Sequence, residues 1–264
     1  MKHQDKVAEM EASGTTLNRF DSSVWNAHLP YKTRSLEMAG LSHISEKTIL
    51  DFGCGPGTFG VILGLRNRLI GVDIAIQALR EAIGRADSYH SDFQAVRVDG
   101  EVLCFRPASF DIVFSGWALH HLPEIEPIIT AFAQLLKPGG LLVIIEPNEG
   151  ALVQKISRFI ENHLNRQILE AGLDTPNRTT HTREEYVATV ERSGFTILNT
   201  FSWYNGEGPE LPKDIRGLRR LALLFLTNAR RALFWLSNSI SGAGPEMYLQ
   251  AQRGTVQGHG TSSD

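Results

Sequence analysis

The chain has 264 residues, of which 42% are hydrophobic and 21% are charged, and its formal net charge is −3. This composition is sufficient for a buried core, and it argues against a largely disordered chain and against a generally basic nucleic-acid binder. The two cysteines, Cys54 and Cys104, are too few for a disulfide-stapled secreted scaffold. The first residues show no signal peptide, and no apolar run approaches the roughly 20 residues of a spanning helix, so we expect a cytoplasmic protein.

Residues 1–47 are mixed and polar, with scattered large apolar side chains, and we expect them to form an N-terminal helical cap. From Thr48 onward, short continuous apolar runs alternate with amphipathic stretches. The apolar runs predict strands that are covered on both faces. These strands are expected at Thr48–Phe52, Arg68–Asp73, Ala95–Asp99, Phe110–Ser115 and Gly140–Glu146. Helices are expected near Thr58–Leu65, Ile76–Gly84 and Glu124–Leu136, with a turn at Lys137–Gly140 after the last one.

The order of these elements predicts an α/β protein with a doubly wound, mostly parallel, Rossmann-like sheet, whose core spans residues 48–204. A capping box formed by Thr182 and Glu185 opens a further helix. Two more strands are expected, at Phe195–Tyr204 and at 246–253. A helical insertion at 205–245 precedes the last strand, and a disordered tail is expected at 254–264.

A glycine-rich turn follows the first predicted strand, where residues 49–60 read ILDFGCGPGTFG. Gly53, Gly55 and Gly57 allow the backbone to turn sharply and to approach a ligand closely. The second predicted strand ends in Asp73, sixteen residues after Gly57. An acid at this place can accept hydrogen bonds from both hydroxyls of a ribose. The turn and the acid together therefore predict a nucleoside-binding site.

Five segments resemble, in family order, the class I S-adenosylmethionine (SAM)-dependent methyltransferases. They are LDFGCGPG, GVDIA, AVRVDGEVLCF, FDIVFSGWALHHL and LLKPGGLLVIIEPN. The residues of these motifs most resemble those of the broad group that includes the quinone-biosynthesis methyltransferases. The resemblance implies a seven-stranded sheet, SAM as the cofactor, and direct in-line transfer of a methyl group to a small-molecule acceptor.

The resemblance also implies roles for individual residues. Those expected to face the cofactor are Asp51, Gly53, Gly55 and Gly57 at the methionine end, Asp73 at the ribose, Ile74, Asp99 and Gly100 around the adenine, and Ser115 and Ala118 at the methionine backbone. Each acid among them has a plainer alternative as an ordinary turn or strand-end residue. The N-terminal segment, with Trp25 and Tyr31, is expected to close over the cofactor.

Two residues are candidates for proton transfer from the acceptor. His121 follows the fourth strand, where a histidine either acts as a general base or simply orients the loop. Glu146, at the end of the fifth strand, is the second candidate. The His120-His121 pair lacks further ligands at a recognisable spacing, so no metal site is expected.

Other functions remain as alternatives. An NAD-dependent oxidoreductase is disfavoured because Thr58 stands where the Gly-x-Gly-x-x-Gly fingerprint needs glycine. A non-catalytic SAM-binding scaffold or partner subunit is compatible with the same motifs. A nucleic-acid substrate is not expected, since the segment Ser115–Ala118 lacks the tetrapeptide of amino-methylating DNA enzymes and the chain is slightly acidic.

The segment Ile215–Leu236 is apolar and rich in arginine, and no acidic residue occurs between Asp214 and Glu246. On a helical wheel the arginines gather on one face and most of the leucines on the other. Three interpretations stay open: a lid that packs its apolar face on the core, a helix on an anionic membrane surface, and a dimer contact. The membrane interpretation would make the protein peripheral at the inner face of a membrane.

Overall fold

A computed structural model describes residues 22–98, 103–156, 181–206, 216–240 and 242–254. Two predicted cofactor residues, Asp99 and Gly100, lie outside these ranges, as does the tail predicted to be disordered beyond residue 254. The helices are α2 (Ser22–Met38), α3 (Gly60–Leu63), α4 (Ile76–Tyr89), η1 (Leu119–His121), α5 (Glu126–Leu135), α8 (Arg183–Arg192) and α9 (Gly217–Ser237). The strands are β1 (Thr48–Phe52), β2 (Arg68–Asp73), β3 (Phe93–Arg97), β4 (Phe110–Gly116), β5 (Leu136–Pro147), β6 (Phe195–Trp203) and β7 (Glu246–Arg253).

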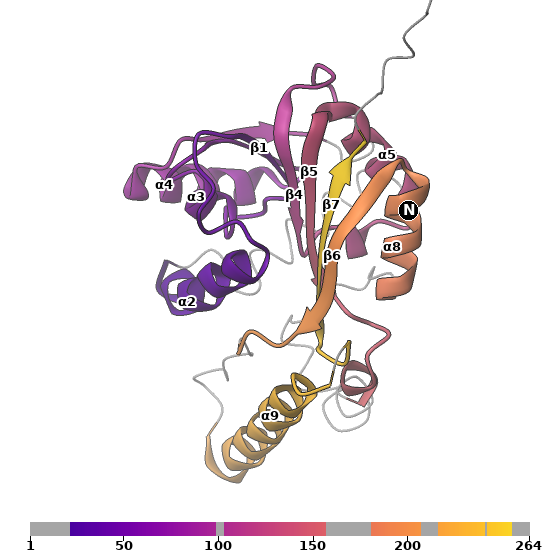
Figure 1. The fold of residues 1–264 in the computed structure, drawn as a ribbon. Helices are drawn as coiled ribbons and strands as arrows, with labels where there is room; N and C mark the ends of the chain where they lie inside the picture. The colour runs from indigo at the N-terminus through magenta and orange to yellow at the C-terminus, as the bar shows by residue number, and fades with distance from the viewer. Residues whose placement is uncertain (1–21, 99–102, 157–180, 207–215, 241, 255–264) are drawn as a thin grey trace, which may run out of the picture.

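The strands form one seven-stranded sheet in the order β3-β2-β1-β4-β5-β7-β6 (Figure 1). Strands β1 to β5 run parallel, and β7 is antiparallel to both of its neighbours, β5 and β6. Successive strands are added toward one edge of the sheet from β1 to β3 and toward the other edge from β4 onward, so β1 and β4 are adjacent although β2 and β3 lie between them in sequence. Such a switch point opens a crevice at the carboxyl ends of the strands, where ligands of doubly wound sheets bind. The predicted sheet is therefore confirmed.

Two strands begin earlier than predicted, and the ends of four strands differ by one or two residues. Strand β3 begins at Phe93, two residues before the predicted start at Ala95, because Phe93 already pairs with Leu69 of β2. Strand β5 begins at Leu136, and the predicted turn at Lys137–Gly140 lies within it. Leu136 pairs with Phe110, and after a shift of register Leu141 pairs with Ile112. The residues between Leu136 and Leu141, including Gly139 and Gly140, therefore form an irregularity within the strand pairing.

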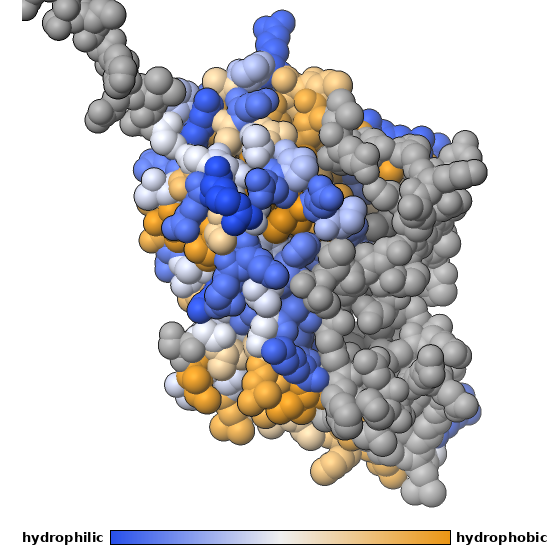
Figure 2. Space-filling model, turned by 90° about the vertical axis from the view of Figure 1, so that its right-hand side faces the viewer, coloured by the Kyte–Doolittle hydropathy of each residue, from blue (hydrophilic) through white to orange (hydrophobic). Residues whose placement is uncertain are grey.

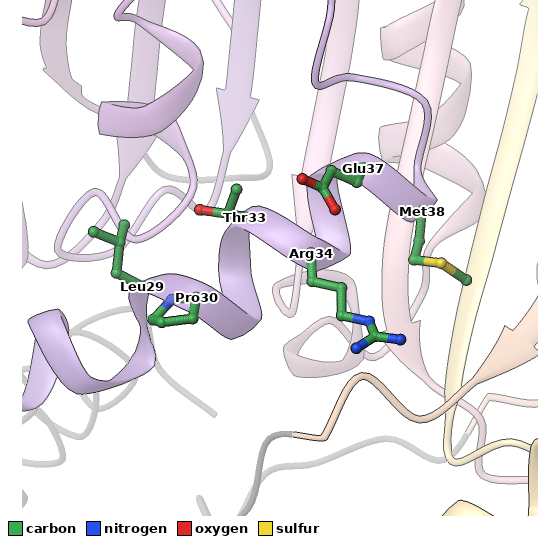
Figure 3. Close-up of a pocket in the computed structure, with 6 residues that line it drawn as sticks. All are labelled: Leu29, Pro30, Thr33, Arg34, Glu37 and Met38. Atoms are coloured by element: carbon green, nitrogen blue, oxygen red, sulfur yellow. The ribbon is translucent and has the colours of Figure 1, made fainter.

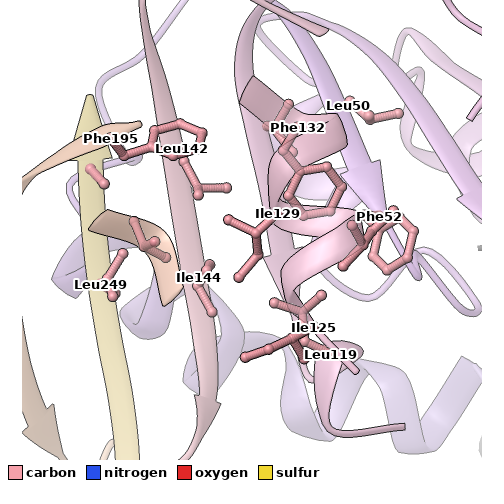
Figure 4. Packing of buried hydrophobic residues seen from close by; sticks show 14 of the residues in the cluster. Leu50, Phe52, Leu119, Ile125, Ile129, Phe132, Leu142, Ile144, Phe195 and Leu249 are labelled. Atoms are coloured by element: carbon pink, nitrogen blue, oxygen red, sulfur yellow. The ribbon is translucent and has the colours of Figure 1, made fainter. Parts of the chain in front are cut away.

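Alternate residues of each buried strand supply two hydrophobic clusters, one on each face of the sheet. Leu50 points into the cluster that packs against α5 and α8, whereas Ile49 points into the cluster shared with α2 and α3. Figure 4 shows Ile129 and Phe132 of α5 against Phe52 of β1 and Ile144 of β5. Burial on both faces explains why these strands are continuous apolar runs in the sequence.

Helix α2 lies across the carboxyl edge of the sheet, and α9 lies at the same end of the molecule (Figure 1). Helix α2 is held to the last strand by polar contacts, since Tyr248 donates to Ser35 Oγ at 3.2 Å and Gln250 donates to the Ala39 carbonyl at 2.7 Å. No helix in the described part of the chain is long and apolar enough to cross a membrane.

Candidate active site

The glycine-rich turn leaves β1 at the switch point of the sheet. Gly53, Gly55 and Gly57 all have positive φ, at +67°, +50° and +77°, which side chains rarely tolerate. A Cβ on Gly53 would lie 2.3 Å from Ala118 Cβ, so this glycine lets the turn pack against the loop after β4. A Cβ on Gly55 would meet no atom within 4 Å. The backbone at Gly55 therefore borders open space, as a ligand cradle requires.

Asp51 lies in β1 directly behind this turn, and its carboxyl group is buried. Its Oδ2 atom is buried without a hydrogen-bond partner. Burial raises the pKa of this carboxyl from 3.8 to about 8, with the nearby Asp73 carboxylate adding to the rise and the Gly60 N–H opposing it. A buried carboxylate oxygen without a partner is costly unless a cation or a donor from a ligand reaches it. Asp51 therefore fits the ammonium group of a bound amino acid moiety.

Asp73 ends β2 and connects the turn to the next helix. Its Oδ2 accepts a hydrogen bond from the Gly55 N–H at 2.8 Å, and its Oδ1 accepts one from the Ala75 N–H at 2.9 Å. Burial raises the pKa of Asp73, while these backbone donors oppose the rise. Each carboxylate oxygen has a second lone pair, so this residue has remaining capacity for hydroxyl donors.

Glu146 ends β5 and is fully buried. Its Oε1 accepts hydrogen bonds from the Ala118 and Leu119 N–H groups at 2.8 and 2.7 Å, and its Oε2 accepts one from His120 Nδ1 at 2.6 Å. These contacts fix the loop after β4 and the short helix η1. The imidazole of His120 in turn lies 4.1 Å, centroid to centroid, from that of His121.

Sequence reasoning missed Lys32 of α2. Its Nζ atom lies 5.1 Å from the ring centre of Phe59 and 5.0 Å from that of Trp117, and the side chain is largely buried. Phe59 belongs to the turn after β1, and Trp117, with φ +61°, to the loop after β4. Lys32 thus links the cap to both loops. The signal in the sequence was its spacing, since Lys32 and the core residue Leu36 are one helical turn apart.

The remaining predicted residues lie around this group. Ser115 is buried in β4, 3.5 Å from the Phe52 carbonyl, and Ile74 is half-buried just after β2. Tyr31 contacts the chain near Gly206, where a Cβ would lie 3.4 Å from its ring, and the side chain of Trp25 lies outside the described residues. In the described ranges, no group of three His, Cys, Asp or Glu side chains is arranged to hold a metal ion.

A separate open groove of about 570 Å³ runs along the outer side of α2 (Figure 3). Its described lining residues are Leu29, Pro30, Thr33, Arg34, Glu37 and Met38. This groove lies on the helix face opposite to Lys32 and Leu36, so it is distinct from the site built around Asp51 and Asp73.

Comparison with known proteins identifies the domain. Residues 50–144 match the family described as a methyltransferase domain. Over these residues the chain is similar to methyltransferase domains. A SAM-dependent methyltransferase from Thermotoga maritima, described as a possible histamine N-methyltransferase, has the same fold, with a TM-score of 0.57 and 16% identity over 91% of this chain and 99% of that one.

Curated relatives of this methyltransferase domain include the ubiquinone biosynthesis O-methyltransferases. The protein from Paraburkholderia phytofirmans is 39% identical over 106 residues, which are 38% of this chain and 44% of the relative. The protein from Burkholderia vietnamiensis is 29% identical over 161 residues, which are 58% of this chain and 64% of the relative. The similarity thus spans less than two thirds of these relatives. The family implies SAM as the cofactor of the domain.

Proposed function

We propose that the protein is a SAM-dependent methyltransferase that moves a methyl group to a small-molecule acceptor by direct in-line displacement. The observation that carries this proposal is the buried Oδ2 of Asp51, which lies beside Gly60 without a hydrogen-bond partner, together with the open backbone at Gly55 in the same turn. A cationic amino acid moiety would stabilise the ionised form of this carboxyl, which burial disfavours, whereas the pyrophosphate of a dinucleotide would disfavour ionisation further. The same observation disfavours the oxidoreductase alternative.

Binding of the cofactor is assigned to the turn and to the strand ends. Asp51 would bind the ammonium group, and Asp73 the ribose hydroxyls through its remaining lone pairs. Lys32 supplies a cation suited to the methionine carboxylate. Further cofactor contacts are assigned to Gly53, Gly57, Ile74, Asp99, Gly100, Ser115 and Ala118. When bound, SAM supplies a sulfonium-activated methyl group.

The chain's contribution to the transfer is mainly positioning, because displacement from a sulfonium needs no covalent help from the protein. We assign Glu146 a positioning role, since it is engaged by Ala118, Leu119 and His120 and has no contact with solvent. His121 is half-buried in the same loop and is the better candidate to accept a proton from the acceptor.

An oxygen acceptor on a largely apolar molecule is the substrate class we favour. Support comes from the names of the curated relatives and from the aromatic side chains Tyr204, Phe234 and Trp235, which pack together at the same end of the molecule as α2. Tyr204 meets Phe234 and Trp235 edge to face, at centroid distances of 5.2 and 5.6 Å.

The test combines binding and turnover. Calorimetry with SAM should show binding by the wild type and a loss of at least about tenfold in affinity for Asp51→Asn. Incubation of the protein with cell extract and methyl-labelled SAM should then yield a labelled product in mass spectrometry, with the label on oxygen. SAM binding without any labelled product would instead support the non-catalytic scaffold, and binding of NAD without SAM would overturn the proposal.

A further inference from the structure

Helix α9 exposes its apolar face rather than burying it. The side chains of Leu221, Phe225 and Leu236 are 63%, 73% and 69% exposed. They lie four and eleven residues apart, which places them on one face of an α-helix. Trp235 and Ile240 extend the exposed apolar surface at the carboxyl end of the helix. These described side chains do not pack on the core, as the lid interpretation would require.

The opposite face attaches α9 to the rest of the protein. Phe234 is buried against Tyr204, Ala151 and Val153, in a small cluster separate from the two main ones. Asn238, just after the helix, accepts a hydrogen bond from the Tyr204 N–H at 2.7 Å and donates one to the Tyr204 carbonyl at 3.1 Å. The helix is thus held by its carboxyl end, and the orientation that leaves its apolar face outward is fixed.

The charge of this segment has a single sign. Between Asp214 and Glu246 the only charged residues are arginines: Arg216, Arg219, Arg220, Arg230 and Arg231. A helix with exposed large apolar side chains and only positive charges is complementary to an anionic lipid surface, where apolar residues enter the acyl boundary and arginines meet headgroups. A second copy of the chain is the alternative occupant, because two exposed apolar faces can pair with the arginines turned away from each other, and the experiment below distinguishes it from a lipid surface.

The position of α9 connects this surface to the site. Figure 2 shows apolar side chains gathered at the lower end of the molecule, where Figure 1 places α9. Arg34 of α2 lies 5.9 Å from the ring centre of Trp235, so the cap over the carboxyl edge contacts α9. Leu152, in the segment after β5, is also 69% exposed.

We propose that the exposed apolar face of α9, with the arginines of that segment, docks the protein on an anionic membrane surface. This docking turns the carboxyl edge of the sheet toward the lipid, so that an apolar acceptor can enter from the bilayer. The membrane attachment itself does not depend on the proposed methyl transfer.

The experiment measures co-sedimentation with vesicles of equal parts phosphatidylcholine and phosphatidylglycerol, and with vesicles of phosphatidylcholine alone. The wild type should bind the anionic vesicles, bind the neutral ones much less, and lose binding as salt is raised. Phe225→Asp should weaken the partition coefficient by at least about tenfold, because an aromatic side chain leaves the acyl boundary. Leu65→Asp, at a site 50% exposed after α3, is the matched control and should bind as the wild type does.

Three results would overturn the docking surface: no vesicle binding by the wild type, equal binding to neutral and anionic vesicles, or equal binding by Phe225→Asp and the wild type. A lipid-free dimer that Phe225→Asp converts to a monomer would also overturn it, in favour of a second copy. SAM affinity, measured on the same preparations, should be equal in the wild type, Phe225→Asp and Leu65→Asp. A failure of vesicle binding with intact SAM affinity would thus leave the proposed function standing.

Discussion

Replacing Asp51 by asparagine should stabilise the protein without SAM and should weaken SAM binding at the same time. The pKa of the Asp51 carboxyl is raised from 3.8 to about 8, chiefly by burial. The folded protein therefore binds this proton more tightly than the unfolded chain does, and stability falls as pH rises from about 4 to about 8. The difference corresponds to at most about 6 kcal/mol at pH 8 and above. Local relaxation and water entry reduce it, so we expect Asp51→Asn to gain about 2–3 kcal/mol at pH 8.5.

The measurement is urea unfolding of the wild type and Asp51→Asn, without SAM, at several pH values from 5.5 to 8.5. Over most of this range the carboxyl is ionised in the unfolded chain and protonated in the folded protein, up to its folded-state pKa of about 8. The advantage of the variant should grow steadily with pH, by no more than about 1.4 kcal/mol per pH unit. Adding SAM should then stabilise the wild type strongly and the variant weakly. A variant whose advantage does not change with pH, or which is less stable than the wild type at pH 8.5, would refute the reasoning.

Three further substitutions test the rest of the site. Asp73→Asn should weaken SAM binding by about 1.5–3 kcal/mol in calorimetry, while Asp87→Asn, on the exposed side of α4, leaves it unchanged; equal affinities would remove the ribose assignment. Glu146→Gln should lower stability by about 1–3 kcal/mol and speed amide exchange in the loop after β4; lost turnover at unchanged stability would instead indicate proton transfer. Gly53→Ala should lower the free energy of unfolding in urea by at least about 2 kcal/mol, because the new Cβ would lie 2.3 Å from Ala118 Cβ at a positive φ. Gly84→Ala is the control, and it should raise the free energy of unfolding because its Cβ would meet no atom within 4 Å. An equal effect of the two alanines would contradict the close packing.

The central strands β1, β4 and β5 were predictable because they are largely buried on both faces, and such burial leaves continuous apolar runs. The predicted bounds of β1 and β2 are the observed ones. The capping box at the start of α8 is also confirmed, with Thr182 and Glu185 exchanging hydrogen bonds at 3.2 and 2.7 Å. The start of β5 was not predictable, since the pairing of Leu136 with Phe110 depends on a neighbouring strand.

The sequence by itself determined the sheet, the glycine turn and the acids at the strand ends, because these depend on local backbone freedom and on the pattern of burial. Only the tertiary structure decided how those side chains are used. Glu146 became a buried anchor because three donors from another loop converge on it, and Lys32 entered the site because α2 lies across two loops distant in sequence. The face that α9 turns outward was decided in the same way: periodicity defines two faces of a helix, and only packing against Tyr204 and its neighbours selects which one is buried.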